Sequence, residues 1–359
     1  MLNRFKRYAA VLLAALFIVF TAAASVEVYA SAGELEDSLR VAIENMDETL
    51  TVYIEDADFD LDKFVEEFDF AGVSKWELTS ARSQRDIRII WEFEYGEVYA
   101  IRKAIENPSF EAKLSPRQAK VLSECRAFVK KNIPDKLTDY EKEKLIHDYL
   151  CINVRFDEEA EEKRLSGIVS EDITPYTAYG ALFNGTAVCE GYANAAWLLL
   201  TLSGVENYIV HSDTHAWNLV KLGSRYCHLD VTWDSSETDL IGTIQYTYFN
   251  LTDEQMTRYP QHRPVNIGLP PADSESYNMY FNRGMRAKDL NDVKRIVTAA
   301  CETGDRSISL WVDDHLTFDY DWQRDLQFVW DLRPGGQYVE SFMFVEPGPD
   351  RDTLTIILE

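Results

Sequence analysis

The strongest constraint on this chain is a stretch between residues 177 and 234, in which a cysteine opens an apolar helix and a histidine and an aspartate follow on two strands. The turn-forming residues 183–186 come just before Cys189, and the alanine- and leucine-rich residues 193–202 predict a buried helix. Cys189 therefore starts this helix, where unpaired N–H groups and the helix dipole favour a thiolate. Gly191, in the first turn, leaves room for another segment to approach.

The histidine and the aspartate are expected on a β-hairpin that turns at Gly223-Ser224. With a two-residue turn, Leu222 pairs with Arg225, and the same register puts His215 diagonally across from Asp230 on one face of the sheet. Diagonal neighbours lie roughly 7 Å apart between backbones, so an imidazole and a carboxylate can meet. A turn longer by one residue would place the two side chains on opposite faces.

This set of residue types is what nucleophilic catalysis by a thiol requires. Cys189 would attack a carbonyl as a thiolate, His215 would hold and then deliver the proton, and Asp230 would fix the tautomer of the imidazole. The backbone N–H of Cys189 is the first donor expected for the oxyanion.

Three sequence blocks here resemble the transglutaminase-like superfamily, a papain-like Cys-His-Asp group, in its bacterial secreted form. The blocks are AYGALFNGTAVCEGYA around Cys189, HAWNLVKL from His215 and YCHLDVTWD around Asp230. The resemblance covers about residues 114–260 and implies that these three residues are nucleophile, base and orienting carboxylate. It also implies an α+β core, in which the helix that carries the cysteine packs on an antiparallel sheet that carries the histidine and the aspartate. The motif companions expected to support or line the cleft are Trp217, Asn218, Trp233 and Tyr192.

Other roles for nearby residues are also open. His228 shares a strand face with Asp230 and is the alternative to His215, although its position opposite Leu219 puts it further from the carboxylate. A metal site is the minority interpretation, because no Cys-x-x-Cys motif is present and the segment has a strand pattern. The residues that it would use are His211, His215, Cys227 and His228. We therefore expect no metal and no cofactor. Four cysteines are expected to be small buried side chains, namely Cys125, Cys151, Cys227 and Cys301, and His147 is expected to be a surface or packing residue.

The first thirty residues have the pattern of an export signal. Arg4, Lys6 and Arg7 precede an apolar run over residues 8–24, and small residues follow at two candidate cleavage sites, after Ala24 and after Ala30. A run of this length is at the lower limit for a membrane span, so an uncleaved N-terminal anchor is the alternative. Either way the protein is expected to be extracytoplasmic, secreted or anchored, with no other membrane contact. The net charge of −25 argues against nucleic acid as a partner.

The remaining chain is expected to form two small α/β modules on either side of the core. The predicted boundaries are residues 1–30 for the signal, 33–104 for the N-terminal module, 110–262 for the core and 272–359 for the C-terminal module. Both modules have a helix, a strand and a later strand in the same order, which suggests an internal repeat, with chance similarity equally favoured. Residues 157–172 and 235–245 are expected to be polar loops, the first bordering the cleft. Prolines 260, 264, 270 and 271 mark a linker.

The resemblance implies an exported thiol enzyme that performs acyl transfer on an amide or peptide bond through a cysteine thioester. Water as the acceptor would make it a peptidase or amidase, and an amine would make it a protein cross-linking enzyme. Its expected partner is a protein or peptide substrate, with cell-wall peptide as the natural class for an exported member. The alternative is a non-catalytic transglutaminase-like binding or scaffold protein at the cell surface.

Overall fold

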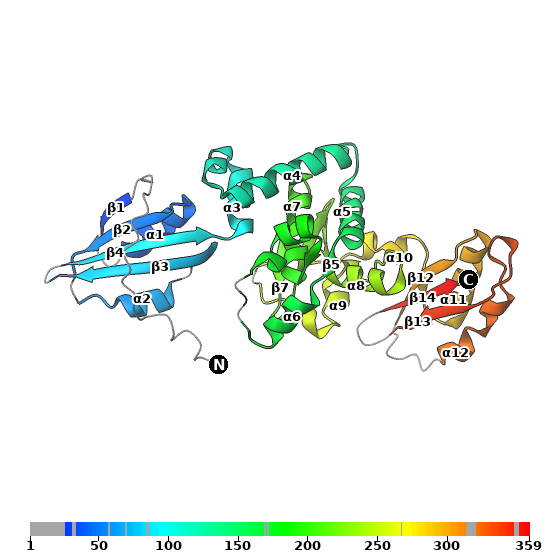
Figure 1. The fold of residues 1–359 in the computed structure, drawn as a ribbon. Helices are drawn as coiled ribbons and strands as arrows, with labels where there is room; N and C mark the ends of the chain where they lie inside the picture. Colours follow the sequence, from blue (N-terminus) through cyan, green and yellow to red (C-terminus); the bar gives the residue numbers. More distant parts are fainter. Residues whose placement is uncertain are drawn as a thin grey trace. The chain divides into compact units, whose positions relative to one another are not determined.

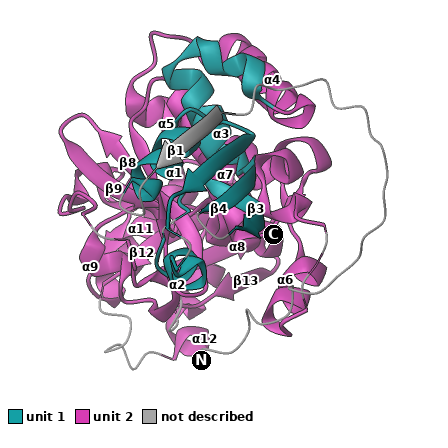
Figure 2. Ribbon diagram, turned by 90° about the vertical axis from the view of Figure 1, so that its left-hand side faces the viewer, with its two compact units in different colours: residues 1–114 teal, residues 115–359 magenta. Residues whose placement is uncertain are grey.

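The structure is a computed structural model that describes residues 26–30 and 34–359, apart from 57, 69, 84–85, 169, 171, 267, 314–320 and 348–351. The chain divides into two compact units, residues 1–114 and 115–359 (Figure 2). The expected N-terminal module lies in the first unit. The expected core, apart from residues 110–114, and the C-terminal module lie in the second. The apolar run over residues 8–24 lies outside the described residues, and none of the described helices is long and apolar enough to cross a membrane.

The first unit is a four-stranded sheet with helices packed on it (Figure 1). Its elements are β1 (Val26–Ala30), α1 (Leu35–Glu44), β2 (Thr49–Ile54), α2 (Leu61–Glu67), β3 (Val73–Arg82), β4 (Ile87–Tyr95), α3 (Glu97–Glu106) and η1 (Pro108–Lys113). The strand order is β1-β2-β4-β3, with β1 parallel to β2 and the other pairs antiparallel.

The expectation that the first thirty residues lie outside the fold is wrong for residues 26–30. These residues form β1 and pair with β2 from Val26 opposite Leu50 to Ala30 opposite Ile54. The apolar alternation of a strand continues directly from the leader-like run, so composition alone does not separate them. Cleavage after Ala24 would keep β1, whereas cleavage after Ala30 would remove it.

The second unit begins with the elements that hold the cysteine, the histidine and the aspartate. They are α4 (Pro116–Asn132), α5 (Asp139–Asn153), β5 (Arg155–Phe156), α6 (Glu158–Leu165), η2 (Thr174–Tyr176), η3 (Gly180–Asn184), β6 (Thr186–Ala187), α7 (Cys189–Leu202), β7 (Asn207–His211), β8 (Ala216–Leu222), β9 (Arg225–Leu229), α8 (Val231–Ile241), β10 (Phe249–Leu251), α9 (Asp253–Met256) and η4 (Pro260–His262). An antiparallel sheet of order β10-β9-β8-β7 packs against α7, which is buried along most of its length. This α+β core, with the cysteine on the helix and the other two residues at strand ends, confirms the expected fold class.

Two segments expected to be loops are largely helical. Residues 157–172 contain α6, because the Asp157 carboxylate accepts from the Ala160 N–H and caps that helix. Residues 235–245 continue α8, which begins after Asp230; its carboxylate accepts from Thr232 and Trp233 N–H groups. In both cases an aspartate read as a loop or strand residue is a helix N-cap.

The C-terminal part repeats the path of the first unit. Its elements are η5 (Glu275–Tyr277), α10 (Met279–Asn282), β11 (Arg286–Ala287), α11 (Leu290–Glu302), β12 (Ser307–Val312), α12 (Trp322–Asp325), η6 (Gln327–Asp331), η7 (Pro334–Gly336), β13 (Phe342–Val345) and β14 (Thr353–Leu358). The strand order β11-β12-β14-β13 has the same parallel and antiparallel pairs as β1-β2-β4-β3. The two α/β modules therefore share a topology, as the suspected repeat required.

Gly191 is required by close packing at the start of α7. A Cβ on this residue would lie 2.5 Å from the Pro175 carbonyl oxygen and 2.8 Å from the Ala187 Cβ. The expectation that Gly191 admits another segment is therefore confirmed, and that segment is η2 together with β6.

We expect Gly191→Ala to lower the free energy of unfolding by about 1–3 kcal/mol, because overpacking must displace backbone. It should also slow alkylation of Cys189, which lies two residues away. The control is Gly204→Ala at the other end of the same helix, where no atom lies within 4 Å and only the positive φ of +80° opposes a side chain. Denaturant unfolding and alkylation with iodoacetamide check both effects. Equal alkylation rates in the two variants would contradict the role of this contact.

Candidate active site

The nucleophile candidate, Cys189, is the one cysteine of this chain that is partly exposed. Cys189 is the first residue of α7, directly after the N-cap residue Val188. The four other cysteines are buried, as expected for small apolar side chains. A thiol in this position lies at the positive end of the helix dipole, which favours a negative charge.

The hairpin has the register that the turn at Gly223-Ser224 predicted. Leu222 pairs with Arg225, and the ladder continues to Asn218 opposite Leu229. His215 lies one residue before β8 and Asp230 one residue after β9, so neither is a strand residue. The prediction that the ladder extends to both of them is wrong, because Asp230 already starts α8.

His215 and Asp230 nevertheless meet directly. The His215 Nε2–H donates to the Asp230 Oδ2 at 2.7 Å, and both side chains are buried. Burial alone would lower the pKa of His215, but the charge and the hydrogen bond of Asp230, followed by interactions with Cys189, raise it to about 10. His215 is therefore an imidazolium at neutral pH, and Nδ1 is the ring nitrogen that Asp230 leaves for the thiol.

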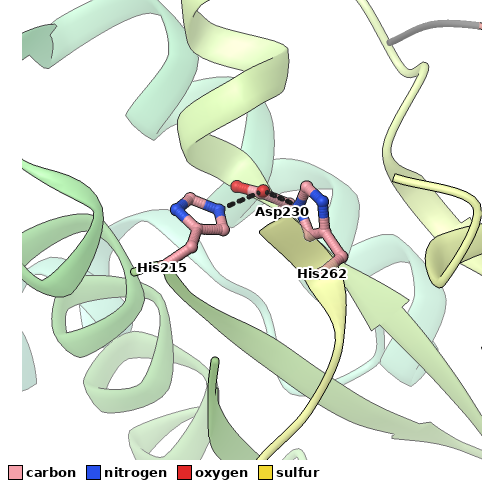
Figure 3. Close-up of side chains that lie close together, drawn as sticks. All are labelled: His215, Asp230 and His262. Atoms are coloured by element: carbon pink, nitrogen blue, oxygen red, sulfur yellow. Dashed lines mark hydrogen bonds and ion pairs between the residues drawn. The ribbon is translucent and has the colours of Figure 1, made fainter. Parts of the chain in front are cut away.

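A second histidine, His262, occupies the other side of the same carboxylate (Figure 3). Its Nε2–H donates to the Asp230 Oδ2 at 2.7 Å, while the Oδ1 accepts from the backbone N–H groups of Thr232 at 2.9 Å and Trp233 at 3.2 Å. Burial alone would raise the pKa of Asp230, but His215 and then His262 hold it well below its usual range. Asp230 is thus an ionised carboxylate that accepts four N–H groups.

The expected companion residues take four different positions. Trp217 is buried and stacks on His215 with ring centroids 5.8 Å apart, and Trp233 lies 5.9 Å from the same ring. Asn218 donates to the Ala193 carbonyl at 3.1 Å and ties β8 to α7. Tyr192 does not line the cleft: it is fully buried, and its hydroxyl donates to the Val154 carbonyl at 2.7 Å.

The alternatives to His215 have other partners. The His228 Nδ1 accepts from the Trp217 Nε1–H at 2.9 Å, and its Nε2–H donates to Asp253 at 2.8 Å. His211 pairs with Glu190 at 3.1 Å. The minority metal set of His211, His215, Cys227 and His228 is therefore not assembled.

One group of donor atoms among the described residues is close enough to hold a metal ion. These donors, on His215, Asp230 and His262, lie within 4.8 Å of one another. Imidazole and carboxylate donors suit a divalent ion such as zinc. Here, however, each imidazole Nε2 already carries the hydrogen that it donates to Asp230, so the set is satisfied by its own hydrogen bonds.

A second cysteine, histidine and aspartate lie together behind the site, fully enclosed. The His147 Nε2 lies 3.1 Å from the Asp234 Oδ2 and 3.5 Å from the Cys151 Sγ, and all three side chains are buried. The Asp234 Oδ1 accepts from the Tyr248 N–H at 3.0 Å. His147 is thus a packing residue between α5 and α8, and the expectation of a surface position does not apply.

Two residues near the site were not found from the sequence. His262 lies in the proline-rich segment read as a linker, and no spacing rule relates it to the hairpin. Arg164 of α6 donates to the carbonyl of Thr214, beside His215, at 3.3 Å. Its hydrogen bond with Glu161, followed by weaker influences that include the charge of Cys189, raises the pKa of Arg164. The segment 157–172 therefore contacts the backbone beside His215 through this arginine.

Comparison with known proteins identifies the domain that carries these residues. Similar solved structures include a TGase (16% identity, 57% of this chain and 59% of that one, TM-score 0.28), a candidate protease from Parabacteroides distasonis (10%, 50% and 39%, 0.24) and a candidate cysteine protease from Cytophaga hutchinsonii (14%, 44% and 61%, 0.24). Each match spans less than two thirds of the other protein. No curated protein matches the sequence. Residues 126–231 match the sequence model of the transglutaminase-like superfamily, so this part of the chain is similar to that superfamily.

Proposed function

We propose that this protein is an exported thiol enzyme that transfers the acyl group of an amide or peptide bond through a thioester on Cys189. The single observation that carries the proposal is the arrangement of Cys189, His215 and Asp230 around the start of α7. A partly exposed thiol at a helix N-terminus lies beside a histidine that a buried carboxylate keeps protonated. A thiolate–imidazolium pair is the reactive form of cysteine acyl-transfer enzymes.

The chemistry follows from the positions of these groups. The Cys189 thiolate adds to the carbonyl carbon, and the N–H groups at the start of α7 face the oxyanion that forms. His215 gives its proton to the leaving amine as the C–N bond breaks, which leaves a thioester. The neutral imidazole then takes a proton from the acceptor, which attacks the thioester and releases the thiolate. Water as the acceptor gives an acid, and a primary amine gives a new amide.

Peptide or protein is the proposed substrate class, and cell-wall peptide is the natural choice for an exported enzyme. Export is proposed from the basic and apolar residues 1–24. The proposed chemistry needs no cofactor, because the residues of the site supply the nucleophile, the acid and the base.

The first test measures the rate of alkylation of Cys189 by iodoacetamide between pH 5 and pH 10. An unperturbed thiol reaches half of its maximal rate near its pKa of about 8.5, and a His-paired thiol at a helix start does so well below about 7.5. We expect the lower midpoint in the wild type and the higher one in His215→Ala. Mass spectrometry of peptides assigns the label, and the four buried cysteines serve as internal controls. An equal midpoint in both proteins, measured also in mild denaturant to open the cleft, would contradict the proposal.

A further inference from the structure

The residue that the proposed chemistry leaves without a role is His262. It is fully buried in η4, and aromatic rings surround it on several sides. Its ring centroid lies 4.6 Å from Trp233, 5.1 Å from Trp217, 5.8 Å from Tyr259 and 6.1 Å from Tyr248. The segment that follows His262 in the chain is fixed to β7, because the Val265 N–H donates to the His211 carbonyl at 2.8 Å. Such a cage holds a ring in one orientation.

The cage directs the Nε2 of His262 at the carboxylate of Asp230. The Nε2–H reaches the Asp230 Oδ2 at the same 2.7 Å as the His215 Nε2–H, and the two imidazoles meet edge to face with centroids 4.9 Å apart. Figure 3 shows the carboxylate between the two rings. Because the Oδ1 is held by backbone N–H groups of α8, His262 supplies the donor that completes the restraint on Asp230.

The environment of the other nitrogen of His262 indicates that the histidine serves as a donor to Asp230. The Nδ1 is buried and has no hydrogen-bond partner among the described residues. Burying a polar atom without a partner costs stability, and an apolar side chain would fill the same aromatic cage without that cost. What histidine adds over an apolar residue at this position is the Nε2–H that points at Asp230.

His262 is also in the neutral protonation state that this role requires. Burial lowers the pKa of His262 and the positive charge of His215 lowers it further, against the opposing influence of Asp230. It is therefore a neutral donor beside an imidazolium, and it does not compete with His215 for the ion pair. A second imidazolium 4.9 Å away would repel the first.

We propose that His262 is a positioning residue for the thiol chemistry: it holds the Asp230 carboxylate from the side opposite His215, and thereby fixes the His215 imidazole beside Cys189. This inference rests on the proposed function. It extends the set of acting groups from three residues to four, and it adds a residue from beyond the matched domain, because η4 lies after residue 231.

The test compares two replacements of His262 with the same two replacements of His228. His262→Leu removes the donor and keeps an apolar side chain, whereas His262→Gln keeps an N–H donor near the position of Nε2. His228 is also buried, its Nε2–H also donates to a carboxylate, that of Asp253, and its Nδ1 accepts from Trp217 of the same cage. His228→Leu and His228→Gln therefore control both for the loss of a buried histidine and for a disturbance of Trp217. The measurement is the pH midpoint of Cys189 alkylation by iodoacetamide, together with thermal unfolding of each variant.

We expect the midpoint of His262→Leu to move upward by about one pH unit, a tenfold smaller thiolate fraction on the acid side, toward the value of His215→Ala. His262→Gln should restore the midpoint to within about 0.3 unit, and both His228 variants should leave it unchanged. The other titratable groups around the site stay the same in all four variants, so they do not cause the shift; they are Cys189, His215, Asp230, Asp234, Arg164, Glu190 and His211.

Three results would overturn the inference: an unmoved midpoint in folded His262→Leu, an equal shift in His228→Leu, or no recovery in His262→Gln. If His262→Leu shows no cooperative unfolding, NMR of wild-type protein with 15N-labelled histidine decides instead. His262 must then be a neutral Nε2–H tautomer while His215 is protonated, and any other state overturns the inference. A wild-type midpoint near about 8.5 would refute the proposed function itself, whereas a low wild-type midpoint that His262→Leu does not move refutes only the role of His262.

Discussion

Cys189→Ala is expected to abolish acyl transfer, with a loss of at least about 10⁴-fold in kcat for any amide substrate of the wild type. No other cysteine can replace it, because the remaining four are buried away from solvent. The fold should be unaffected, since the Cys189 thiol is only partly buried and a smaller side chain leaves no enclosed cavity. The matched control is Cys125→Ala, which removes a buried thiol from α4 and should keep full activity.

The measurement is a panel of glutamine-containing peptides and cell-wall peptides, each incubated with water alone or with a primary amine. Mass spectrometry distinguishes hydrolysis from amide exchange, and a mass increase on Cys189 identifies the acyl-enzyme. The panel thus also decides the acceptor. If Cys189→Ala matched the wild type in every reaction and in peptide binding, the protein would be a non-catalytic scaffold with a transglutaminase-like domain.

How far the sequence predicts this site depends on whether local patterns determine each residue's position. Cys189 was placed at the start of a helix because turn formers and an apolar run flank it, and α7 begins at that residue. The hairpin register followed from the two-residue turn at Gly223-Ser224 alone. A turn fixes register locally, so this part of the geometry could be derived without the rest of the fold.

The local environment of Asp230 was harder to predict because two signals overlap there. The residue follows an alternating strand, and the polar residues 235–245 after it look like a loop. Its carboxylate instead caps α8 through two backbone N–H groups, a role that aspartate often takes. For the same reason α6, which Asp157 caps, was predicted to be a loop. An aspartate before a polar segment can therefore signal a helix as well as a loop.

His262 could not be predicted from local patterns at all. It lies between prolines in a segment without periodicity, and the chain brings it to Asp230 only through tertiary packing with Trp217 and Trp233 and through the bond of Val265 to the end of β7. The one available signal was a histidine in a segment otherwise read as a linker. Tertiary contacts of this kind carry no spacing rule, which is why a fourth residue of the site emerged only with the structure.

The second large effect is expected from Asp230→Asn, which should lower kcat by about 10⁴-fold, the scale seen when an orienting carboxylate becomes an amide. The Asn oxygen can still accept from Thr232 and Trp233. Its NH₂ group then replaces Oδ2 and faces two imidazole N–H donors. At least one ring must change tautomer or turn away, and His215 loses the charge that raises its pKa to about 10. The Cys189 alkylation midpoint should therefore rise toward that of a free thiol, near about 8.5.

The matched control is Asp234→Asn, the same change one helical turn along α8 in an equally buried position. Burial raises the pKa of Asp234 to about 6, against the opposing influence of His147, so this carboxylate is still mostly ionised at neutral pH and Asp234→Asn also removes a buried charge. An Asn there can keep the Tyr248 N–H bond through its oxygen and donate its NH₂ to the His147 Nε2, while the Nδ1–H of that ring serves Asp148 at 3.1 Å.

Burial alone would lower the pKa of His147, but Cys151, Asp148 and Asp234 hold it well above its ordinary value, so in Asp234→Asn the ring loses its Nε2 proton and one neutral tautomer satisfies the new amide. We expect kcat and the alkylation midpoint to stay within about threefold and about 0.3 unit of wild type. Asp230→Asn has no comparable solution, because both His215 and His262 would have to become Nδ1–H tautomers. That change would leave His215 uncharged and would place a hydrogen on the buried Nδ1 of His262, which has no hydrogen-bond partner among the described residues. The comparison separates the loss of a buried carboxylate from the loss of this acceptor. Equal losses in the two variants would show that α8 acts only as a scaffold, and would contradict the assignment of Asp230 as the residue that orients His215.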